Sequence, residues 1–233
     1  MTVTDNLAAE LTRELNTETL FTIPVLGGIQ INESTVITWI IMAILVIASI
    51  LLTRNLKVEN PGKVQLLLES GIQWVYDFFD DIYGKQNRGY TPYLMTVLVF
   101  LAFSNTFMVL LGFKPPTKDL NVTVALALIS LFLIETAGMR RKGIKGYIKH
   151  FTEPVAMITP INILEIAIRP MSLCMRLFGN VFGAFVVMEL IKLIAPVIIP
   201  IPFSMFFDIF DGLLQAYIFV FLTAIFMNNE MED

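Results

Sequence analysis

Long apolar segments that carry almost no charge are the feature that most constrains this chain. Residues 35–53 contain no charged side chain, and at 1.5 Å per residue a helix of this length spans the roughly 30 Å hydrocarbon core of a bilayer. Of the 233 residues, 56% are hydrophobic and only 15% are charged, whereas soluble domains carry about 25% charged residues. The sequence therefore predicts an all-α polytopic membrane protein, with one integral membrane domain over residues 1–233.

The apolar pattern predicts five membrane-crossing helices and one helix at the membrane surface. Residues 61–82 place their apolar side chains on one helical face, which is typical of an interfacial amphipathic helix. Residues 140–150 are rich in Lys and Arg and are expected to form a basic loop. The expected crossings are residues 35–53, 93–112, 121–138, 161–195 and 203–227.

The first 34 residues are expected to lie outside the cytoplasm. They lack the basic-then-apolar layout of a signal peptide, so we expect no cleavage. Pro24, Gly27 and Gly28 indicate a turn or short hairpin before the first crossing. The segments 54–92 and 139–160 hold most of the Lys and Arg residues, so the positive-inside rule places them in the cytoplasm. Five crossings then leave the N-terminus outside and the C-terminus in the cytoplasm.

The fourth predicted crossing is longer than a bilayer is thick. About 35 helical residues extend roughly 52 Å, so this helix must tilt, bend or extend beyond the lipid. Pro170 could kink the helix or begin a new one. Arg176 lies within this apolar segment and cannot lose its proton to avoid the cost of burial. An intramembrane arginine of this kind indicates a functional site.

Polar residues recur on one face of each of the last two predicted helices. Glu165 and Arg169, four residues apart, are as well explained by a solvated surface pair as by a channel. Glu189 lies on the opposite side from Arg176 and is expected to pair with Lys192. The stripe on the fourth crossing comprises Glu165, Arg169, Ser172, Arg176, Asn180 and Gly183, and that on the fifth comprises Ser204, Asp208, Asp211 and Gln215.

Two interpretations fit these stripes. In the first, Arg176 and an aspartate only hold the two helices together. In the second, which we favour, the stripes line a water-accessible path, because an isolated buried ion pair gains little once desolvation is counted. Two carboxyl groups on an otherwise apolar helix require water, a cation or a bound proton.

The run Arg169-Pro170-Met171-Ser172-Leu173-Cys174-Met175-Arg176-Leu177-Phe178-Gly179-Asn180 resembles the signature of subunit a of F-type ATP synthases. Three further segments match in the same order along the chain: Asp119-Leu120-Asn121-Val122-Thr123, Pro160-Ile161-Asn162 and Leu214-Gln215-Ala216-Tyr217-Ile218-Phe219. The resemblance covers most of the chain from about residue 20 onward and implies that the last two helices are long and steeply tilted.

The resemblance implies an ion-translocating stator subunit, not catalytic alone, in a bacterial plasma membrane. Arg176 would face a rotating ring of c subunits, with Asn180 and Gln215 as its polar neighbours. Two half-channels would carry H⁺ or Na⁺, with Asp208, Asp211 and Gln215 on the outer one and Glu165 and Arg169 as candidates for the cytoplasmic one. The implied partners are the c-ring, b-type peripheral stalk subunits, the rest of the synthase and lipid. No cofactor, metal site or nucleic-acid partner is expected.

The chain departs from the family pattern at one position. Many members carry a carboxylate nine residues after the arginine, where this chain has Phe185. Asp208, Asp211 or Glu189 could supply the missing group. The alternative function is a secondary ion transporter with an intramembrane Arg/Asp pathway. Such a transporter usually shows two related halves, and no such repeat is found in this sequence.

Overall fold

The computed structural model describes residues 19–23, 29–107, 115–152, 159–194 and 200–232. An antiparallel hairpin of β1 (Thr19–Ile23) and β2 (Ile29–Asn32) precedes the first long helix. This hairpin matches the prediction from the proline and the two glycines, although those three residues lie outside the described part. The helix α2 (Glu33–Thr53) follows β2 directly.

Within the described residues, four helices are long and apolar enough to cross a membrane. These are α2, the first 24 residues of α6 (Leu120–Thr152), α7 (Thr159–Ile194) and the C-terminal helix. The second predicted crossing begins as α4 (Thr91–Ala102), which continues into a π-helical turn over Phe103–Phe107. Its remaining residues lie outside the described part, so the count of five crossings stays a prediction.

The predicted interfacial helix is present as α3 (Lys63–Tyr83), and a 3₁₀ segment over Lys85–Tyr90 joins it to α4. The end of α3 packs on the C-terminal helix, where the ring of Phe78 lies 5.6 Å from that of Tyr217 and 6.1 Å from that of Phe221. Val64 and Leu67, near its start, remain exposed. The first half of the amphipathic face is therefore free to contact lipid or a partner.

The expected basic loop over 140–150 is wrong. The helix α6 continues through these residues to Thr152, with a kink at Gly143, where the backbone φ is 71°. Residues with a side chain rarely adopt this conformation, so glycine permits the change of direction there. Asp119 begins α6, since its side chain accepts a hydrogen bond from the backbone N–H of Asn121 at 2.9 Å and another from the Ser34 hydroxyl.

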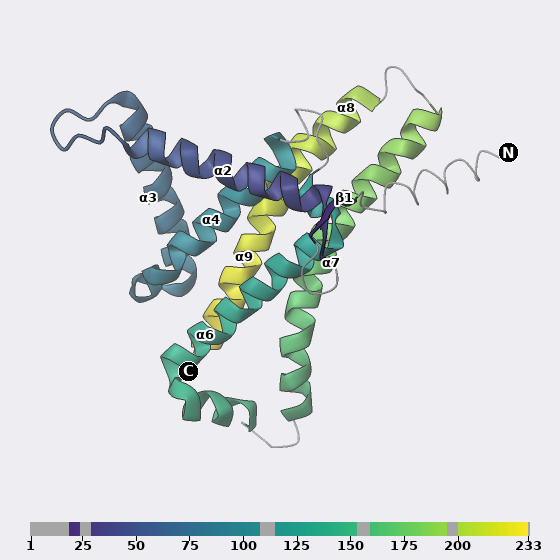
Figure 1. The fold of residues 1–233 in the computed structure, drawn as a ribbon. Coiled ribbons are helices and arrows are strands. Elements are labelled where there is room, and N and C mark those ends of the chain that lie inside the picture. The colour runs from purple at the N-terminus through teal and green to yellow at the C-terminus, as the bar shows by residue number, and fades with distance from the viewer. Residues whose placement is uncertain (1–18, 24–28, 108–114, 153–158, 195–199, 233) are drawn as a thin grey trace.

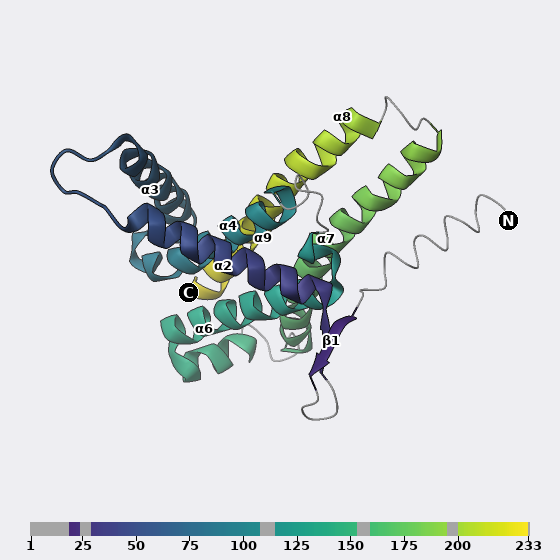
Figure 2. The same cartoon turned by 45° about the horizontal axis from the view of Figure 1, so that its top comes forward.

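The last two long helices run alongside each other in opposite directions (Figures 1 and 2). The helix α7 has 36 residues and passes through Pro170 without a break, which gives a length of about 54 Å. The returning segment consists of α8 (Pro200–Met205), a π-helical stretch over Phe206–Asp211 and α9 (Gly212–Met231). It extends four residues beyond the predicted end at residue 227, so that Glu230 lies on the helix.

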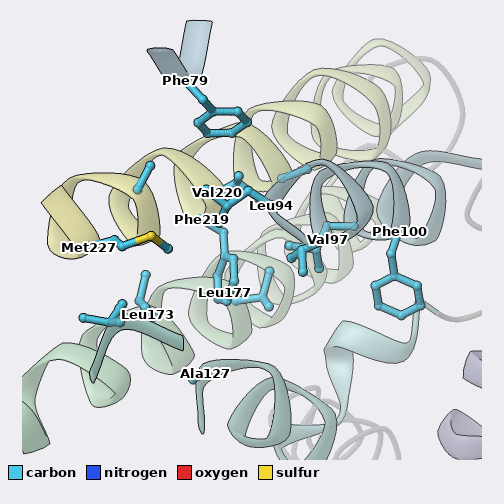
Figure 3. Close-up of a cluster of buried hydrophobic side chains, with 14 of the residues drawn as sticks. Phe79, Leu94, Val97, Phe100, Ala127, Leu173, Leu177, Phe219, Val220 and Met227 are labelled. Atoms are coloured by element: carbon cyan, nitrogen blue, oxygen red, sulfur yellow. The ribbon is translucent and has the colours of Figure 1, made fainter. Parts of the chain in front are cut away.

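The helix α9 lies at the centre of the packing and contacts α3, α4, α6 and α7. Figure 3 shows the apolar cluster that these contacts bury. Phe219, Val220 and Met227 contribute from α9, whereas Leu173 and Leu177 contribute from α7, and all five are at most 1% exposed. Figures 1 and 2 show α2 crossing this bundle at a wide angle. The arrangement fixes one face of α7 in the core and leaves the opposite face open.

Candidate polar path along the last two helices

Arg176 lies on the open face of α7. Its side chain is exposed, whereas Leu173 and Leu177, which lie roughly 60° and 100° away around the same turns of the helix, are buried. Among the described side chains, no carboxylate forms an ion pair with Arg176, and the ion pairs of α7 involve Arg169 and Lys192 instead. No described aspartate therefore neutralises the guanidinium charge of Arg176, and this charge lies on the outside of the chain.

Asn180, one helical turn after Arg176, joins α7 to α9. Its side-chain Nδ2 donates a hydrogen bond of 2.5 Å to Oε1 of Gln215. Gln215 is 1% exposed, whereas Asn180 is exposed. The amide nitrogen of Gln215 is buried and has no partner among the described residues. The structure thus brings together two polar residues that lie 35 positions apart in the sequence, beside Arg176.

The two aspartates of the last helix lie on its π-helical stretch, Phe206–Asp211. Asp211 is half-buried, and its side chain forms no hydrogen bond or ion pair with another described residue. The side chain of Asp208 is outside the described part. π-helical turns inside α-helices occur frequently at functional sites, because the extra residue changes the direction of the side chains.

A second π-helical turn, Phe103–Phe107, packs against this stretch. It holds Asn105, whose Oδ1 accepts a 2.7 Å hydrogen bond from Thr117, while its Nδ2 and the hydroxyl of Ser104 are buried without a described partner. Gly212 lies directly against Asn105. Buried polar atoms of this kind require water or another ligand. Sequence reasoning missed this cluster, although the run Ser104-Asn105-Thr106 inside an apolar segment was a usable signal.

Arg169 is buried rather than solvated. It is 8% exposed, and its guanidinium binds Glu165 at 2.9 Å and also Glu230 on α9. The interpretation of Glu165 and Arg169 as a surface pair is therefore incomplete, since only Glu165 is exposed. Glu230 was missed because the predicted helix ended at residue 227. Continuing the spacing of four and three from Gln215 would have placed Glu230 on the same face.

Glu189 pairs with Lys192 at 2.7 Å, as the sequence predicts. Four residues earlier, the ring of Phe185 lies under the Lys118 ammonium group, 3.9 Å from the ring centroid. At the position where many family members carry a carboxylate, this chain thus holds an aromatic ring against a cation. Within the described ranges, no group of three or more His, Cys, Asp or Glu residues is arranged to hold a metal ion.

The fold and the site define a multi-helix membrane protein that presents an exposed arginine on one long helix. Residues 35–228 match the family model described as ATP synthase A chain. The chain belongs to this family, subunit a of ATP synthase, a subunit of the membrane sector, and so the secondary-transporter alternative is not supported.

Curated relatives are similar over nearly the whole chain. "ATP synthase subunit a" of Moorella thermoacetica is 37% identical over 204 residues, which cover 88% of this chain and 93% of the relative. "ATP synthase subunit a 1" of Hahella chejuensis is 37% identical over 208 residues, with 89% and 88% covered. "ATP synthase subunit a, sodium ion specific" of Propionigenium modestum is 32% identical over 225 residues, with 88% and 76% covered.

Proposed function

We propose that this subunit forms two half-channels for H⁺ or Na⁺ and presents Arg176 to a rotating ring of c subunits. The observation that carries the proposal is the exposed Arg176 on α7, which has no ion-pair partner among the described residues. A guanidinium without a counter-charge is costly in a membrane segment, and none of the described residues supplies one. A carboxylate of the ring provides that charge when it passes.

Arg176 controls the protonation of the passing group by its charge. A fixed guanidinium favours the ionised form of a nearby carboxylate, so the ring releases its ion before it passes Arg176. The same positive charge repels a cation that would otherwise leak directly from one half-channel to the other. Each elementary charge that moves down the membrane potential releases about 2.3 kcal/mol per 100 mV, which drives rotation.

The outer half-channel uses Asp208, Asp211 and Gln215. Buried polar atoms of Ser104 and Asn105 that have no partner among the described residues lie near the same end of α9 and support a hydrated path there. The cytoplasmic half-channel uses Glu165 and Arg169. Of the three acids that could replace the family carboxylate, we assign the role to the two aspartates, because Glu189 already has Lys192 as its counter-ion.

The subunit is non-catalytic by itself and acts with the c-ring, b-type peripheral stalk subunits and the rest of the synthase. We assign it to a bacterial plasma membrane, with the N-terminus outside and the C-terminus in the cytoplasm. This orientation agrees with the exposed Arg140 and Arg141 at the end of the apolar part of α6. Arg176→Ala should abolish ATP-driven ion pumping in vesicles that contain the whole complex. Retained coupled pumping would overturn the proposal, and the dependence of ATP hydrolysis on sodium identifies the ion.

A further inference from the structure

A buried group of charges joins the end of α9, the first half of α7 and the end of the apolar part of α6. Its centre is the Arg169 guanidinium, which binds Glu230 and Glu165 and lies 5.7 Å from the ring centroid of Phe226. Glu230 is 5% exposed. Glu135, on α6, interacts electrostatically with both Glu230 and Arg169.

Two carboxylate oxygens in this group are left without a hydrogen-bond partner. These are Oε2 of Glu230 and Oε1 of Glu135, and both are buried with no partner in the described part of the chain. Gly138, one turn after Glu135, allows the close approach of α9. A methyl group on Gly138 would lie only 3.3 Å from Cβ of Glu230. The two acidic side chains thus enter the same buried space from neighbouring helices.

Among the described side chains, the charges in this space do not balance. Arg169 supplies one positive charge, which Glu230 and the exposed Glu165 already share. Lys142, on α6, has a buried Nζ that forms no hydrogen bond with either acid or with any other described residue. Tyr147, whose ring also lies against Gly138, is a further titratable side chain at this place. A buried carboxylate and a half-buried one, beside one shared guanidinium, favour the binding of a further cation.

We propose that Glu135 and Glu230 share one exchangeable monovalent cation, H⁺ or Na⁺, and that this site receives the transported ion on its way to the cytoplasm. The second part rests on the proposed function above. Arg169 precedes Arg176 by two helical turns, about 10 Å along α7, on the side of the predicted cytoplasmic end. The ion leaves the ring carboxylate, neutralises the Glu135–Glu230 pair and is released to cytoplasmic water, which restores the pair.

Cation occupancy can be tested on the unmodified complex. A hydrophobic carbodiimide reacts with protonated carboxyl groups, so mass spectrometry of the treated synthase should find the adduct on Glu135 or Glu230 and none on the exposed Glu232. A site that holds H⁺ loses this labelling as the pH rises, and one that exchanges Na⁺ for H⁺ is also protected by added Na⁺. A complex labelled on the ring carboxylate but on neither glutamate, at any pH or sodium concentration, overturns the proposal.

Transport through the site can be tested by passive ion conduction after removal of the soluble head. Complexes with Glu135→Gln or Glu230→Gln should each conduct ions roughly tenfold more slowly. This loss is smaller than the hundredfold or more that a positioned proton-transfer group typically contributes, because the other carboxylate remains. Glu232→Gln is the matched control, since it removes the same charge two residues after Glu230. The side chain of Glu232 is exposed and accepts a hydrogen bond from Asn228. Labelled glutamates with unchanged conduction in both variants would overturn the transport role. Labelling reports occupancy whether or not the ring turns, so its result is independent of the Arg176 test.

Discussion

Asn180 on α7 donates its amide N–H to the buried side-chain oxygen of Gln215 on α9, at 2.5 Å. This bond joins the two antiparallel helices one turn from Arg176. Neither helix alone fixes where the Arg176 side chain lies relative to α9, so the amide pair sets the register between them. Because Gln215 is 1% exposed and Asn180 is exposed, the bond also lies at the boundary between the core and the open face of α7.

The bond between Asn180 and Gln215 should appear as non-additivity in a double-mutant cycle. Asn180→Ala leaves a buried acceptor on Gln215 without its partner, which costs about 1–3 kcal/mol. The double variant Asn180→Ala/Gln215→Ala removes donor and acceptor together, so we expect an interaction energy of about 0.5–3 kcal/mol between the two sites. The measurement is the thermal stability of complexes that carry Asn180→Ala, Gln215→Ala or both changes. Strictly additive effects would show that the bond makes no contribution to joining the two helices.

The open face of α7 should be sensitive to added volume only in the assembled synthase. A Cβ added at Gly179 or Gly183 would meet no atom of the described chain within 4 Å. Gly179 follows Arg176 by three residues. Small residues permit close approach of a neighbouring membrane helix. Gly179→Leu should therefore leave the subunit folded while weakening its association with the c-ring by about 1–3 kcal/mol, as overpacking does.

Co-purification of the ring with the detergent-solubilised subunit measures this association. Gly71→Leu, on α3, is the matched control, because a Cβ added at Gly71 would also meet no described atom within 4 Å. Equal ring recovery from both variants would place the ring elsewhere.

The connection after α3 should loosen in acid. Arg88 binds Asp80 and holds the pKa of that carboxyl below its ordinary value of 3.8. A depressed pKa in the folded state means that the bond stabilises the fold above pH 3.8 and is lost as the pH falls through the lower, folded-state pKa. Gln86 is exposed and lies between Asp80 and Arg88 in the sequence. A fluorophore attached to Gln86→Cys should therefore gain mobility as the pH falls through the folded-state pKa of Asp80.

Fluorescence anisotropy measures the mobility of this label. Asp80→Asn should make it mobile at neutral pH as well. An anisotropy that is the same in both proteins at neutral pH would show that Arg88 and Asp80 do not hold this segment.

Helical periodicity predicted the polar face of α7 and α9, but not which of its members are buried. The spacing of Glu165, Arg169, Arg176 and Asn180 places them on one face, yet Arg169 is buried and Arg176 is exposed. The difference arises because Glu230, near the end of α9, binds Arg169, whereas no described acid pairs with Arg176. That pairing depends on contacts between residues far apart in the sequence, which a periodic pattern in one helix does not contain.

Sequence reasoning missed Glu230 and Asn105 for a different reason. Glu230 lies beyond the last strongly apolar residue, so a hydropathy pattern ends the helix before it. Asn105 lies on a π-helical turn, which has no distinct apolar period in so short a stretch. The kink at Gly143 likewise follows from one backbone angle, and a glycine in a basic segment is equally compatible with a loop. These features depend on local geometry and tertiary packing, whereas the long apolar helices depend on composition alone.

Gly212 should tolerate no side chain larger than a methyl group. A Cβ at this position would lie 3.2 Å from both the Cβ and the backbone oxygen of Asn105. In Gly212→Ala, this crowding opposes the gain in helix propensity of about 1 kcal/mol, so we expect little net change in stability. Gly212→Val should destabilise the subunit by about 1–3 kcal/mol, because it separates the two π-helical turns.

Thermal unfolding of the purified complex and passive ion conduction test this prediction together. Gly71→Val is the matched control, since a Cβ at Gly71 meets no atom within 4 Å. Gly212→Val should reduce both stability and conduction, because Asp211, the preceding residue, moves with the turn and away from the unpaired polar atoms of Ser104 and Asn105. Conduction equal to that of Gly71→Val would show that contact between the two turns is not needed for the outer half-channel.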